Sequence, residues 1–373
     1  MSVILPVYNH AAMLGEAVES VLAQTYPDFE LIILNDGSTD DIDAVFRRYQ
    51  GHPRIRLLTQ PNQKLPKALS NAFEFARGEF HTWTSADNLM EPRLLERLVA
   101  FLREHPDVEM VYADYVAIDD RGEPLRDPAF RPQNKRRPDS PEIHLPRDPR
   151  PLNTVDDNFI GACFLYRSRA SRVLGEYAPE LGCEDYDYWM RMNALFRIAH
   201  LGTDEVLYRY RVHDNTLSGR ARELRISERV RALMEYERQR ATFYAQPWEI
   251  VVDSVTEAWV SGADRGSHTV RRVADVSGPQ ENGRKRLFLI GAETLDRLSI
   301  AARGEGDCLA VWFDGDPAAP YRHRRMLREG VDLCLCGREE AAARAGLFAP
   351  NVFVTPSGEA ALDLAVAFAN NRV

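Results

Sequence analysis

Short apolar runs that alternate with amphipathic helical stretches constrain the fold of this chain more than any other feature of its sequence. Five of these runs have the composition of buried strands and lie at 3–7, 31–34, 55–58, 80–84 and 109–113. Between them, apolar side chains repeat at helical spacing, at 13–22, 42–49, 67–76 and 93–102. Because strand–helix–strand units pair their strands in parallel, the sequence predicts a Rossmann-like α/β domain with a mainly parallel mixed sheet.

The first alternation is interrupted by a stretch rich in proline, aspartate and arginine at 119–157, a loop length typical of functional or disordered segments. Order resumes with a strand, a helix and another strand, at 159–166, 187–196 and 206–210. We therefore assign residues 1–215 to the first domain. A long charged helix at about 220–244 belongs to the next segment, which we interpret as a helical segment and connector over 216–284.

A second alternation starts at residue 285. Four apolar runs have strand character, at 287–290, 309–313, 332–336 and 352–354. Helical stretches accompany them near 292–303, 321–329, 338–346 and 358–371. This pattern predicts a small Rossmann-like α/β domain over 285–373. Gly291-Ala292-Glu293 puts a carboxylate where a phosphate loop would attract an anion, so we expect partner docking or homo-oligomerisation rather than a second catalytic centre.

Charge and cysteine content exclude several classes of protein. Asp and Glu outnumber Lys and Arg by 56 to 47, and the net charge of −9 disfavours bulk attraction to nucleic acid or anionic lipid. With no membrane-length apolar run and no signal-peptide pattern, we expect a cytoplasmic protein, either free or peripheral at the inner face of the membrane. The five cysteines lack a framework spacing, and Cys334 and Cys336 alternate in an apolar run, which indicates packing in a reducing compartment.

Polar clusters follow three of the predicted strands at the point where each strand ends. They are Pro6-Val7-Tyr8-Asn9, Asn35-Asp36-Gly37-Ser38-Thr39-Asp40 and Ser85-Ala86-Asp87-Asn88. The carboxyl ends of parallel strands meet at one edge of a sheet, beside helix N-termini, and ligands bind there. The Asp36 carboxylate is suited to accept a hydrogen bond from a nucleobase N–H or a ribose hydroxyl, although a plain turn before a helix also favours aspartate.

The ordered set of motifs over residues 1–215 resembles the family 2 glycosyltransferases, which are inverting enzymes of the GT-A fold. The motifs are V-I-L-P-V-Y-N, L-N-D-G-S-T-D-D, A-R-G-E-F, T-S-A-D-N and G-C-E-D-Y-D-Y-W-M-R-M. The resemblance implies transfer of a sugar from a nucleoside diphosphate sugar, with uridine as the favoured base, to an acceptor hydroxyl. Polysaccharide, lipid-linked and protein-linked acceptors all remain open.

The resemblance also implies which residues contact the donor. They are Pro6, Val7, Tyr8, Asn9, Asp36, Lys67, Ser85, Ala86 and Asp87. The first four would line the base and ribose pocket, and Asp36 would bind the base or the ribose. Lys67, and Lys64 before it, would approach the phosphates unless they are ordinary solvated lysines.

Asp87 would hold a divalent metal ion, Mn²⁺ or Mg²⁺, because the leaving diphosphate needs its growing negative charge neutralised. Family members commonly have an Asp-x-Asp arrangement here, whereas this chain has Asp87 as a single carboxylate. His213, after the strand at 206–210, is our candidate second ligand because family members often place a histidine there; a structural histidine is the alternative. Arg209 or Arg211 is a further candidate for the diphosphate.

Glu184 and Asp185 precede the aromatic residues Tyr186, Tyr188 and Trp189 at a predicted helix start, where carboxylates also complement the helix dipole. The resemblance makes Asp185 the general base and Glu184 a supporting contact to the acceptor. A single displacement at the anomeric carbon, with a carboxylate taking the acceptor's proton, inverts the configuration. Aromatic neighbours would desolvate such a carboxylate.

Two alternatives from other classes stay open. A non-catalytic sugar-nucleotide-binding module that acts through its C-terminal domain would explain the single carboxylate at Asp87. A nucleotidyltransferase on a related fold would need a glycine-rich basic loop after the first strand, where this chain has Tyr8-Asn9-His10.

Gly161 indicates either close approach of the donor sugar or tight packing. The basic run at 135–137 is either solvated or part of acceptor recognition.

Overall fold

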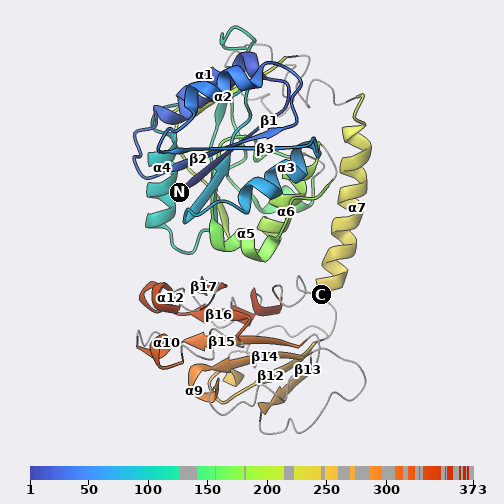
Figure 1. Ribbon diagram of the computed structural model, residues 1–373. Helices are drawn as coiled ribbons and strands as arrows, with labels where there is room; N and C mark the ends of the chain where they lie inside the picture. Colours follow the sequence, from blue (N-terminus) through green and yellow to red (C-terminus); the bar gives the residue numbers. More distant parts are fainter. Residues whose placement is uncertain are drawn as a thin grey trace. The chain divides into compact units, whose positions relative to one another are not determined.

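The computed structural model divides the chain into two compact units, Met1–Glu235 and Tyr236–Val373 (Figure 1). The described residues are 1–125, 141–155, 157–179, 182–213, 222–244, 248–258, 269–273, 286–295, 307–313, 318–323, 327, 331–345, 349, 351–355, 361–362, 364–366 and 368. The basic run at 135–137 lies outside them, as do parts of the helices predicted near 292–303, 321–329, 338–346 and 358–371.

The main sheet of the first unit has the strand order β10-β6-β9-β4-β1-β2-β3. Its strands are β1 (Ser2–Val7), β2 (Glu30–Asp36), β3 (Ile55–Gln60), β4 (Phe80–Trp83), β6 (Met110–Tyr112), β9 (Phe164–Arg167) and β10 (Ile198–His200). Strand β9 runs antiparallel to β4 and β6, and the other pairs are parallel. The prediction of a mainly parallel mixed sheet is confirmed.

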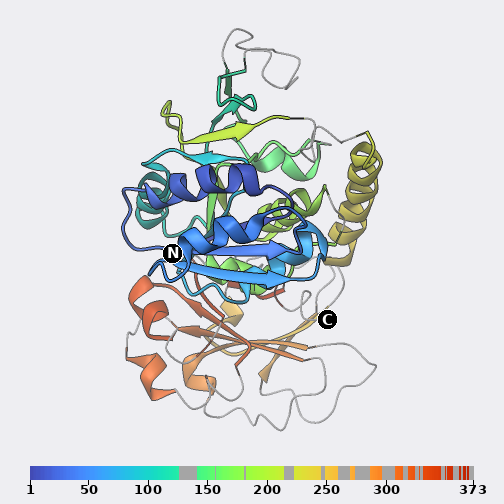
Figure 2. The same cartoon turned by 45° about the horizontal axis from the view of Figure 1, so that its top comes forward.

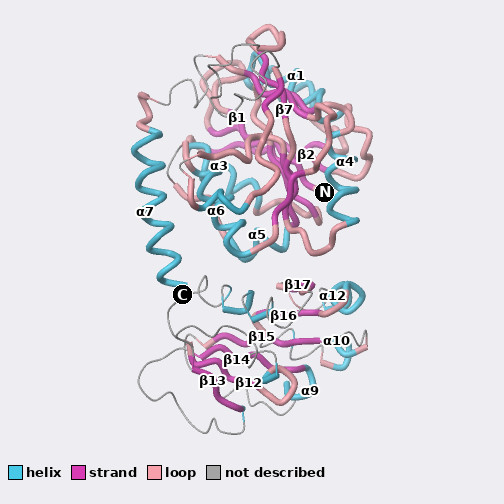
Figure 3. Tube along the Cα trace, turned by 180° about the vertical axis from the view of Figure 1, so that it is seen from behind, coloured by secondary structure: helices cyan, strands magenta, loops and turns pink. Residues whose placement is uncertain are grey.

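Helices cover both faces of this sheet, which explains why β1 and β2 read as nearly continuous apolar runs. Figures 1 and 3 show α1 on one side of β1 and β2 and α3 on the other. The helices are α1 (Ala11–Leu22), α2 (Ile42–Tyr49), α3 (Lys64–Phe73), α4 (Leu94–Glu104), α5 (Ser168–Leu174) and α6 (Glu184–Leu195). Helix α1 buries Leu14, Ala17, Val18 and Val21, the helical spacing that the sequence showed.

A second, smaller sheet in the first unit has the order β5-β11-β7-β8. Its strands are β5 (Leu89–Met90), β11 (Tyr208–Arg211), β7 (Tyr115–Ile118) and β8 (Glu142–Ile143). Figure 2 shows the yellow-green strand β11 beside the short strand β5, to which it pairs antiparallel. The loop predicted at 119–157 therefore contains β8 and a short 3₁₀ helix, Arg150–Asn153, elements too short for a periodic signal.

The first unit ends at Glu235, beyond the predicted residue 215, because it includes the first part of helix α7 (Ile226–Tyr244). Its residues Val230, Leu233 and Met234 pack against the core of the first unit. The predicted helix start at residue 220 lies outside the described residues. The division of the chain thus falls inside the predicted segment 216–284, because the apolar residues of α7 pack, partly buried, against the first unit.

The second unit contains a parallel six-stranded sheet of order β13-β12-β14-β15-β16-β17. Its strands are β12 (Glu249–Val252), β13 (Thr269–Arg272), β14 (Arg286–Gly291), β15 (Cys308–Phe313), β16 (Leu333–Cys336) and β17 (Val352–Val354). Its described helices include α9 (Ala292–Leu295), α10 (Ala319–Arg322) and α12 (Glu339–Ala345).

The four strands predicted in the second unit are confirmed, but the connector predicted within 216–284 is wrong for β12 and β13. Both strands join the sheet, and β12 is buried as Ile250, Val251 and Val252 because β13 and β14 flank it. The order, with the first strand between the second and the third, is that of a flavodoxin-like doubly wound sheet.

All five cysteines are described, each as a buried thiol, and Cys334 and Cys336 belong to the core of the second unit, as predicted. In the part of the chain that the structure describes, no helix is both long and apolar enough to cross a membrane.

Candidate active site

The three predicted polar clusters meet at the edge of the main sheet where the strand order reverses. From β1 the chain continues to one side through β2 and β3, and then returns to β4 on the other side of β1. Ligands of open α/β sheets bind at such a switch point, outside the carboxyl ends of the strands. Residues 8–10 follow β1, and residues 85–88 follow β4.

Hydrogen bonds join the loop after β1 to the loop after β2. The Asn9 side-chain oxygen accepts from the Thr39 backbone N–H at 2.7 Å, and the Asn9 backbone N–H donates to Ser38 Oγ at 3.0 Å. The first N–H of α1, from Ala11, donates to Asp40 Oδ2 at 2.7 Å. Asn9 adopts a φ of 55°, which asparagine tolerates better than most residues. These contacts make Asn9 a residue that positions the loop.

The other residues predicted to line the base pocket differ in exposure. Pro6 and Val7 are buried within β1, whereas Tyr8 is 43% exposed. The Lys64 ammonium lies 6.0 Å from the centre of the Tyr8 ring. Tyr8 is therefore the member of this set that offers a side-chain surface to a ligand.

One oxygen of Asp36 is held by the protein. Its Oδ1 accepts from Gln60 Nε2 at 2.7 Å and from the Gln63 backbone N–H at 2.8 Å. Gln60 is itself held by Asn71, whose side-chain nitrogen donates to Gln60 Oε1 at 2.8 Å. Oδ2 of Asp36 has no hydrogen-bond partner among the described residues. The carboxylate is thus fixed in position and keeps one oxygen for a donor group.

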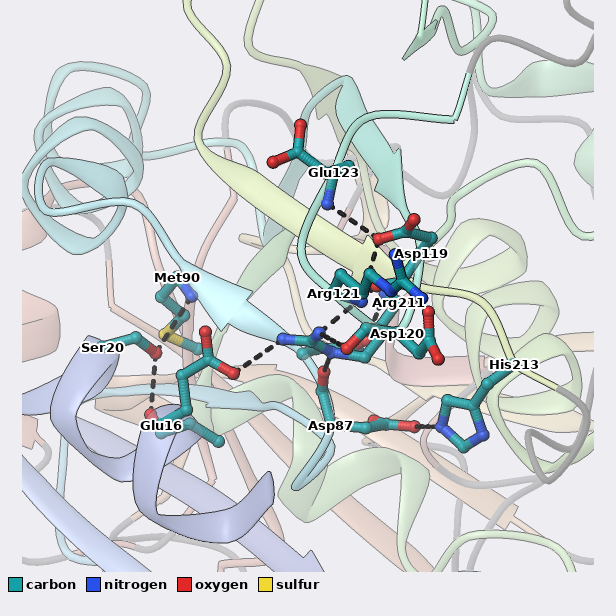
Figure 4. Close-up of polar contacts among 12 residues, drawn as sticks. Glu16, Ser20, Asp87, Met90, Asp119, Asp120, Arg121, Glu123, Arg211 and His213 are labelled. Atoms are coloured by element: carbon teal, nitrogen blue, oxygen red, sulfur yellow. Dashed lines mark hydrogen bonds and ion pairs between the residues drawn. The ribbon is translucent and has the colours of Figure 1, made fainter. Parts of the chain in front are cut away.

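Asp87 and His213, which are 126 positions apart, are in contact (Figure 4). Asp87 Oδ2 lies 3.1 Å from His213 Nε2. Asp87 Oδ1 is buried and finds no hydrogen-bond partner in the described ranges. A buried carboxylate oxygen without a partner is costly unless a cation or water satisfies it, so these residues fit a divalent ion.

His10 is a third member of this cluster, which the sequence did not single out. One possible ligand atom from each of His10, Asp87 and His213 lies within 4.8 Å of the others. The His10 ring lies 5.8 Å from the His213 ring, centre to centre. The sequence signal was available, because His10 directly follows the Pro6–Asn9 cluster, but nothing local distinguishes it from a helix-flanking histidine.

Arg211 holds the Asp87 loop through hydrogen bonds to Asp87 and Asn88. Its side chain is 3% exposed. Its Nε donates to the Asp87 backbone carbonyl at 2.8 Å, and its Nη2 pairs with Glu16 at 2.8 Å (Figure 4). Its backbone N–H donates to the Asn88 side-chain oxygen at 2.8 Å. Arg209 pairs with Glu91, so both arginines are engaged by the protein.

For the other residues predicted to contact the donor, Lys67, Ser85 and Ala86, the structure gives less support than it does for Asp36 and Asp87. The Lys67 ammonium forms an exposed ion pair with Glu176 at 2.8 Å. Ala86 is buried and Ser85 is partly exposed. Gly161 has a φ of +71°, and a Cβ there would lie 2.5 Å from the Tyr115 ring, which favours the tight-packing explanation.

Glu184 and Asp185 start helix α6 but differ in environment. Asp185 Oδ2 accepts from Asn158 Nδ2 at 2.9 Å, and its Oδ1 accepts from the Tyr186 backbone N–H at 2.7 Å. Glu184 is buried and accepts from the Gly182 backbone N–H. Burial and the nearby Asp185 charge raise the pKa of Glu184 to about 8. Glu184 is therefore mostly protonated at neutral pH and is a poor base.

A pocket of about 350 Å³ opens beside Asp185. Its other lining residues are Asp157, Asn158, Gly182, Tyr186, Ile226, Ser227, Val230 and Arg231. The last four come from the first turns of α7, a helix to which the sequence assigned no role in the site. Their contribution could not be foreseen, because α7 follows α6 by thirty positions and reaches it only through tertiary packing.

Residues 2–175 match the model of the family described as Glycosyl transferase family 2. An uncharacterized glycosyltransferase of Rickettsia typhi is 31% identical over 218 residues, which cover 57% of this chain and 64% of that protein. EpsE of Bacillus subtilis, whose name describes it as a glycosyltransferase, is 29% identical over 229 residues, covering 59% of this chain and 76% of EpsE. The crystal structure of S. aureus TarS 1–349 in complex with UDP has 23% identity, a TM-score of 0.45, and coverage of 63% of this chain and 64% of TarS 1–349.

The fold and the match define an α/β domain of the glycosyltransferase class with the mixed sheet expected of GT-A proteins. The residues that match this family model, 2–175, all lie within the first unit. The chain spans 34% of the length of the relatives from Rickettsia conorii and Rickettsia felis, and 64% of the relative from Rickettsia typhi.

Proposed function

We propose that the chain is an inverting glycosyltransferase that moves a sugar from a nucleoside diphosphate sugar to an acceptor hydroxyl. The observation that carries this proposal is that two carboxylates of the first unit, Asp87 and Asp185, lie in different environments. Asp87 has a buried, unpartnered oxygen beside His213 at the switch point, as far as the described residues go. Asp185 lines a separate pocket large enough for an acceptor group.

The nucleoside binds at the loops after β1 and β2. Asp36, held by Gln60 and Gln63, offers Oδ2 to a base N–H or a ribose hydroxyl. The exposed ring of Tyr8 offers a surface on which the base stacks. An imide N–H of a uracil base is a donor that suits a carboxylate oxygen, so we propose a uridine donor.

Asp87 and His213 would hold the divalent ion, Mn²⁺ or Mg²⁺, that a nucleoside diphosphate donor requires. When bound, the ion neutralises the charge that grows on the diphosphate as it leaves. Arg211 keeps Asp87 in place through the Asp87 backbone carbonyl, and it leaves the carboxylate itself for the ion.

Asp185 accepts the proton of the acceptor hydroxyl as the acceptor oxygen bonds to the anomeric carbon. The bond between that carbon and the diphosphate oxygen breaks in the same displacement, so the configuration inverts. Asn158 donates to Asp185 Oδ2 and orients the carboxylate. Burial and the neighbouring Asp185 raise the pKa of Glu184 to about 8, which favours Asp185 over Glu184 as the base.

The acceptor enters the pocket beside Asp185. A sugar hydroxyl of a polysaccharide, a lipid-linked glycan or a glycosylated protein fits this chemistry, and Arg231 supplies a cation at the pocket wall. The buried thiols support a reducing, cytoplasmic setting. For the second unit we propose a docking or oligomerisation role.

Asp185→Asn tests the proposal. It removes the base and keeps the size of the side chain, so we expect sugar transfer to fall at least about 1,000-fold while donor binding is unchanged. Asp157→Asn, in the same pocket wall, is the matched control and is expected to retain transfer. Near-normal transfer by Asp185→Asn would overturn the base assignment.

The alternative class is a non-catalytic sugar-nucleotide-binding module, which the single carboxylate at Asp87 favours. A thermal-shift screen of nucleoside diphosphates and their sugars, with and without Mn²⁺, identifies the donor. The identified donor is then incubated with a panel of acceptors. Binding of the donor with no product on any acceptor would favour the non-catalytic module.

A further inference from the structure

We propose that His10 is a third protein ligand of the divalent ion, so that this chain binds the ion through two imidazoles and one carboxylate. Such a site prefers transition-metal ions such as Mn²⁺ and Co²⁺ to Mg²⁺, and it binds them before any nucleotide is present. The inference rests on the proposed function only for the purpose of the ion, namely the neutralisation of a donor diphosphate.

The His10 ring is oriented as a metal ligand needs to be. Its Nδ1 lies 2.8 Å from the Tyr8 carbonyl oxygen. A carbonyl only accepts hydrogen bonds, so the proton of the neutral ring is on Nδ1 and the lone pair is on Nε2. Histidine ligands in proteins usually donate their second N–H to a carbonyl or carboxylate in this way, which fixes both tautomer and orientation.

The ring has no competing structural role at the helix start. His10 is the residue before α1, yet its side chain makes no capping hydrogen bond. Asp40 caps α1 instead, because its Oδ2 accepts the Ala11 backbone N–H at 2.7 Å. His10 is also only half-buried.

Three separate segments converge on this point: the loop after β1, the loop after β4 and the end of β11. Their possible ligand atoms lie within 4.8 Å of one another. Ligands that bind an ion at ~2.1 Å lie ~3 to ~4 Å from each other, so small side-chain rotations close the site. The unpartnered Oδ1 of Asp87 leaves this carboxylate an oxygen that His213 does not occupy, as judged from the described residues.

The ligand set explains the metal preference. Mg²⁺ requires oxygen ligands and dehydrates reluctantly, whereas imidazole nitrogen binds first-row transition ions well. His10 and His213 replace oxygen ligands with nitrogen, and this change weakens Mg²⁺ relative to Mn²⁺ and Co²⁺. With three protein ligands, the ion no longer depends on the diphosphate to complete a minimal site.

The test uses the full chain, without nucleotide, titrated with Co²⁺ and followed by its visible absorption and by calorimetry. We expect wild type to bind Co²⁺ with a change in its visible absorption that saturates at one ion per chain, and to bind Mg²⁺ at least about tenfold more weakly. His10→Ala is expected to raise the dissociation constant for Co²⁺ at least about tenfold. His52→Ala, which changes a histidine between α2 and β3, is the control and is expected to bind as wild type does.

His10→Gln keeps a polar side chain of similar length and covers the case in which His10→Ala fails to fold. Pulsed electron paramagnetic resonance of bound Mn²⁺ should detect two imidazole nitrogens in wild type and one in His10→Gln. Equal Co²⁺ affinity in wild type and both variants, or equal nitrogen signals, would overturn the inference. Uridine nucleotide binding and sugar transfer are measured separately. Failure of the His10 inference would leave the proposed function standing, and failure of the proposed function would leave the His10 inference standing.

Discussion

Each unit of this chain has an aspartate where a parallel strand ends at a reversal of strand order, but the two aspartates are used differently. In the first unit, Asp87 keeps a buried oxygen with no hydrogen-bond partner in the described part of the chain. In the second unit, Asp253 follows β12, next to β14. Its Oδ1 accepts the backbone N–H groups of Val255 and Thr256, each at 3.0 Å, and its Oδ2 accepts the Gly291 N–H at 2.8 Å.

This difference in hydrogen bonding distinguishes a ligand site, at Asp87, from a structural turn, at Asp253. Burial raises the pKa of Asp253, but hydrogen bonds from Thr294, Thr256 and Gly291 outweigh burial and hold its pKa below the ordinary value. Both oxygens of Asp253 accept hydrogen bonds from the protein, Oδ1 from its own loop and Oδ2 from Gly291 at the end of β14. An aspartate at the end of a strand therefore indicates a binding site only where the fold leaves an oxygen unpaired.

Between these two aspartates, the larger effect on sugar transfer is expected at Asp87. Asp87→Asn weakens coordination of the ion, so transfer should fall at least about 100-fold and Mn²⁺ binding should weaken. The melting temperature should change little, because no hydrogen bond within the described residues is lost at Oδ1. Steady-state kinetics, Mn²⁺ calorimetry and thermal melts measure the three quantities. A large loss of stability with unchanged transfer would mean that Asp87, like Asp253, has a structural role.

The opposite result is expected at Asp253. Asp253→Ala leaves the Gly291, Val255 and Thr256 N–H groups without their acceptor, so the second unit should lose about 3 kcal/mol of stability while transfer is retained. Hydrogen exchange of the β12 and β14 amides reports this loss within the full chain. Since its folded pKa is lowered, the Asp253 contribution is present above the unfolded pKa and is lost as the pH falls through the folded value. Unchanged exchange in Asp253→Ala would refute its structural role.

A smaller, pH-dependent effect is expected at Glu184, a carboxyl that is buried but paired with a backbone N–H. Its pKa is raised from 4.5 to about 8, so between these values the unfolded chain ionises while the folded chain keeps its proton. The stability of the first unit should therefore fall with rising pH over this window, by up to about 1.4 kcal/mol per pH unit. Below the window both states are protonated, and the penalty is absent.

Glu184→Gln keeps the neutral shape and should flatten this slope, as measured by urea unfolding between pH 5 and pH 8. Exposed Glu74→Gln is the control and should keep the wild-type slope. The same slope in wild type and Glu184→Gln would mean that another group carries it.

Much of the fold could be predicted because it follows from local patterns. The strands β1, β2, β14 and β15 are buried on both faces, and their apolar runs are visible in the sequence. Strand β12 was interpreted as part of the connector although Ile250, Val251 and Val252 form an apolar run, whereas several other missed strands are short or irregular in composition. Strands β5 and β8 have two residues each, and β13 reads as Thr269–Arg272 with two arginines, so none carries a strand pattern of its own.

The candidate site could be predicted only where parallel pairing dictates it. Because parallel strands end at one edge, the Tyr8, Asp36 and Asp87 loops had to meet once the sheet was inferred. His213 was placed by resemblance, and its contact with Asp87 depends on the pairing of β11 with β5 and β7. His10, Arg211 and the α7 wall of the pocket depend on contacts that no sequence pattern records.

Burial pattern and strand direction are encoded in short stretches, so two α/β units, their mainly parallel sheets and the edge at which the polar loops lie follow from local patterns. The tertiary structure decided which polar groups are satisfied by the protein and which are left for a ligand. Hydrogen-bond satisfaction depends on partners tens to hundreds of positions away, as Arg211 with Glu16 and His213 with Asp87 illustrate. For that reason Asp87 and Asp253, which both follow a strand of a largely parallel sheet, differ in the hydrogen bonds that their oxygens accept.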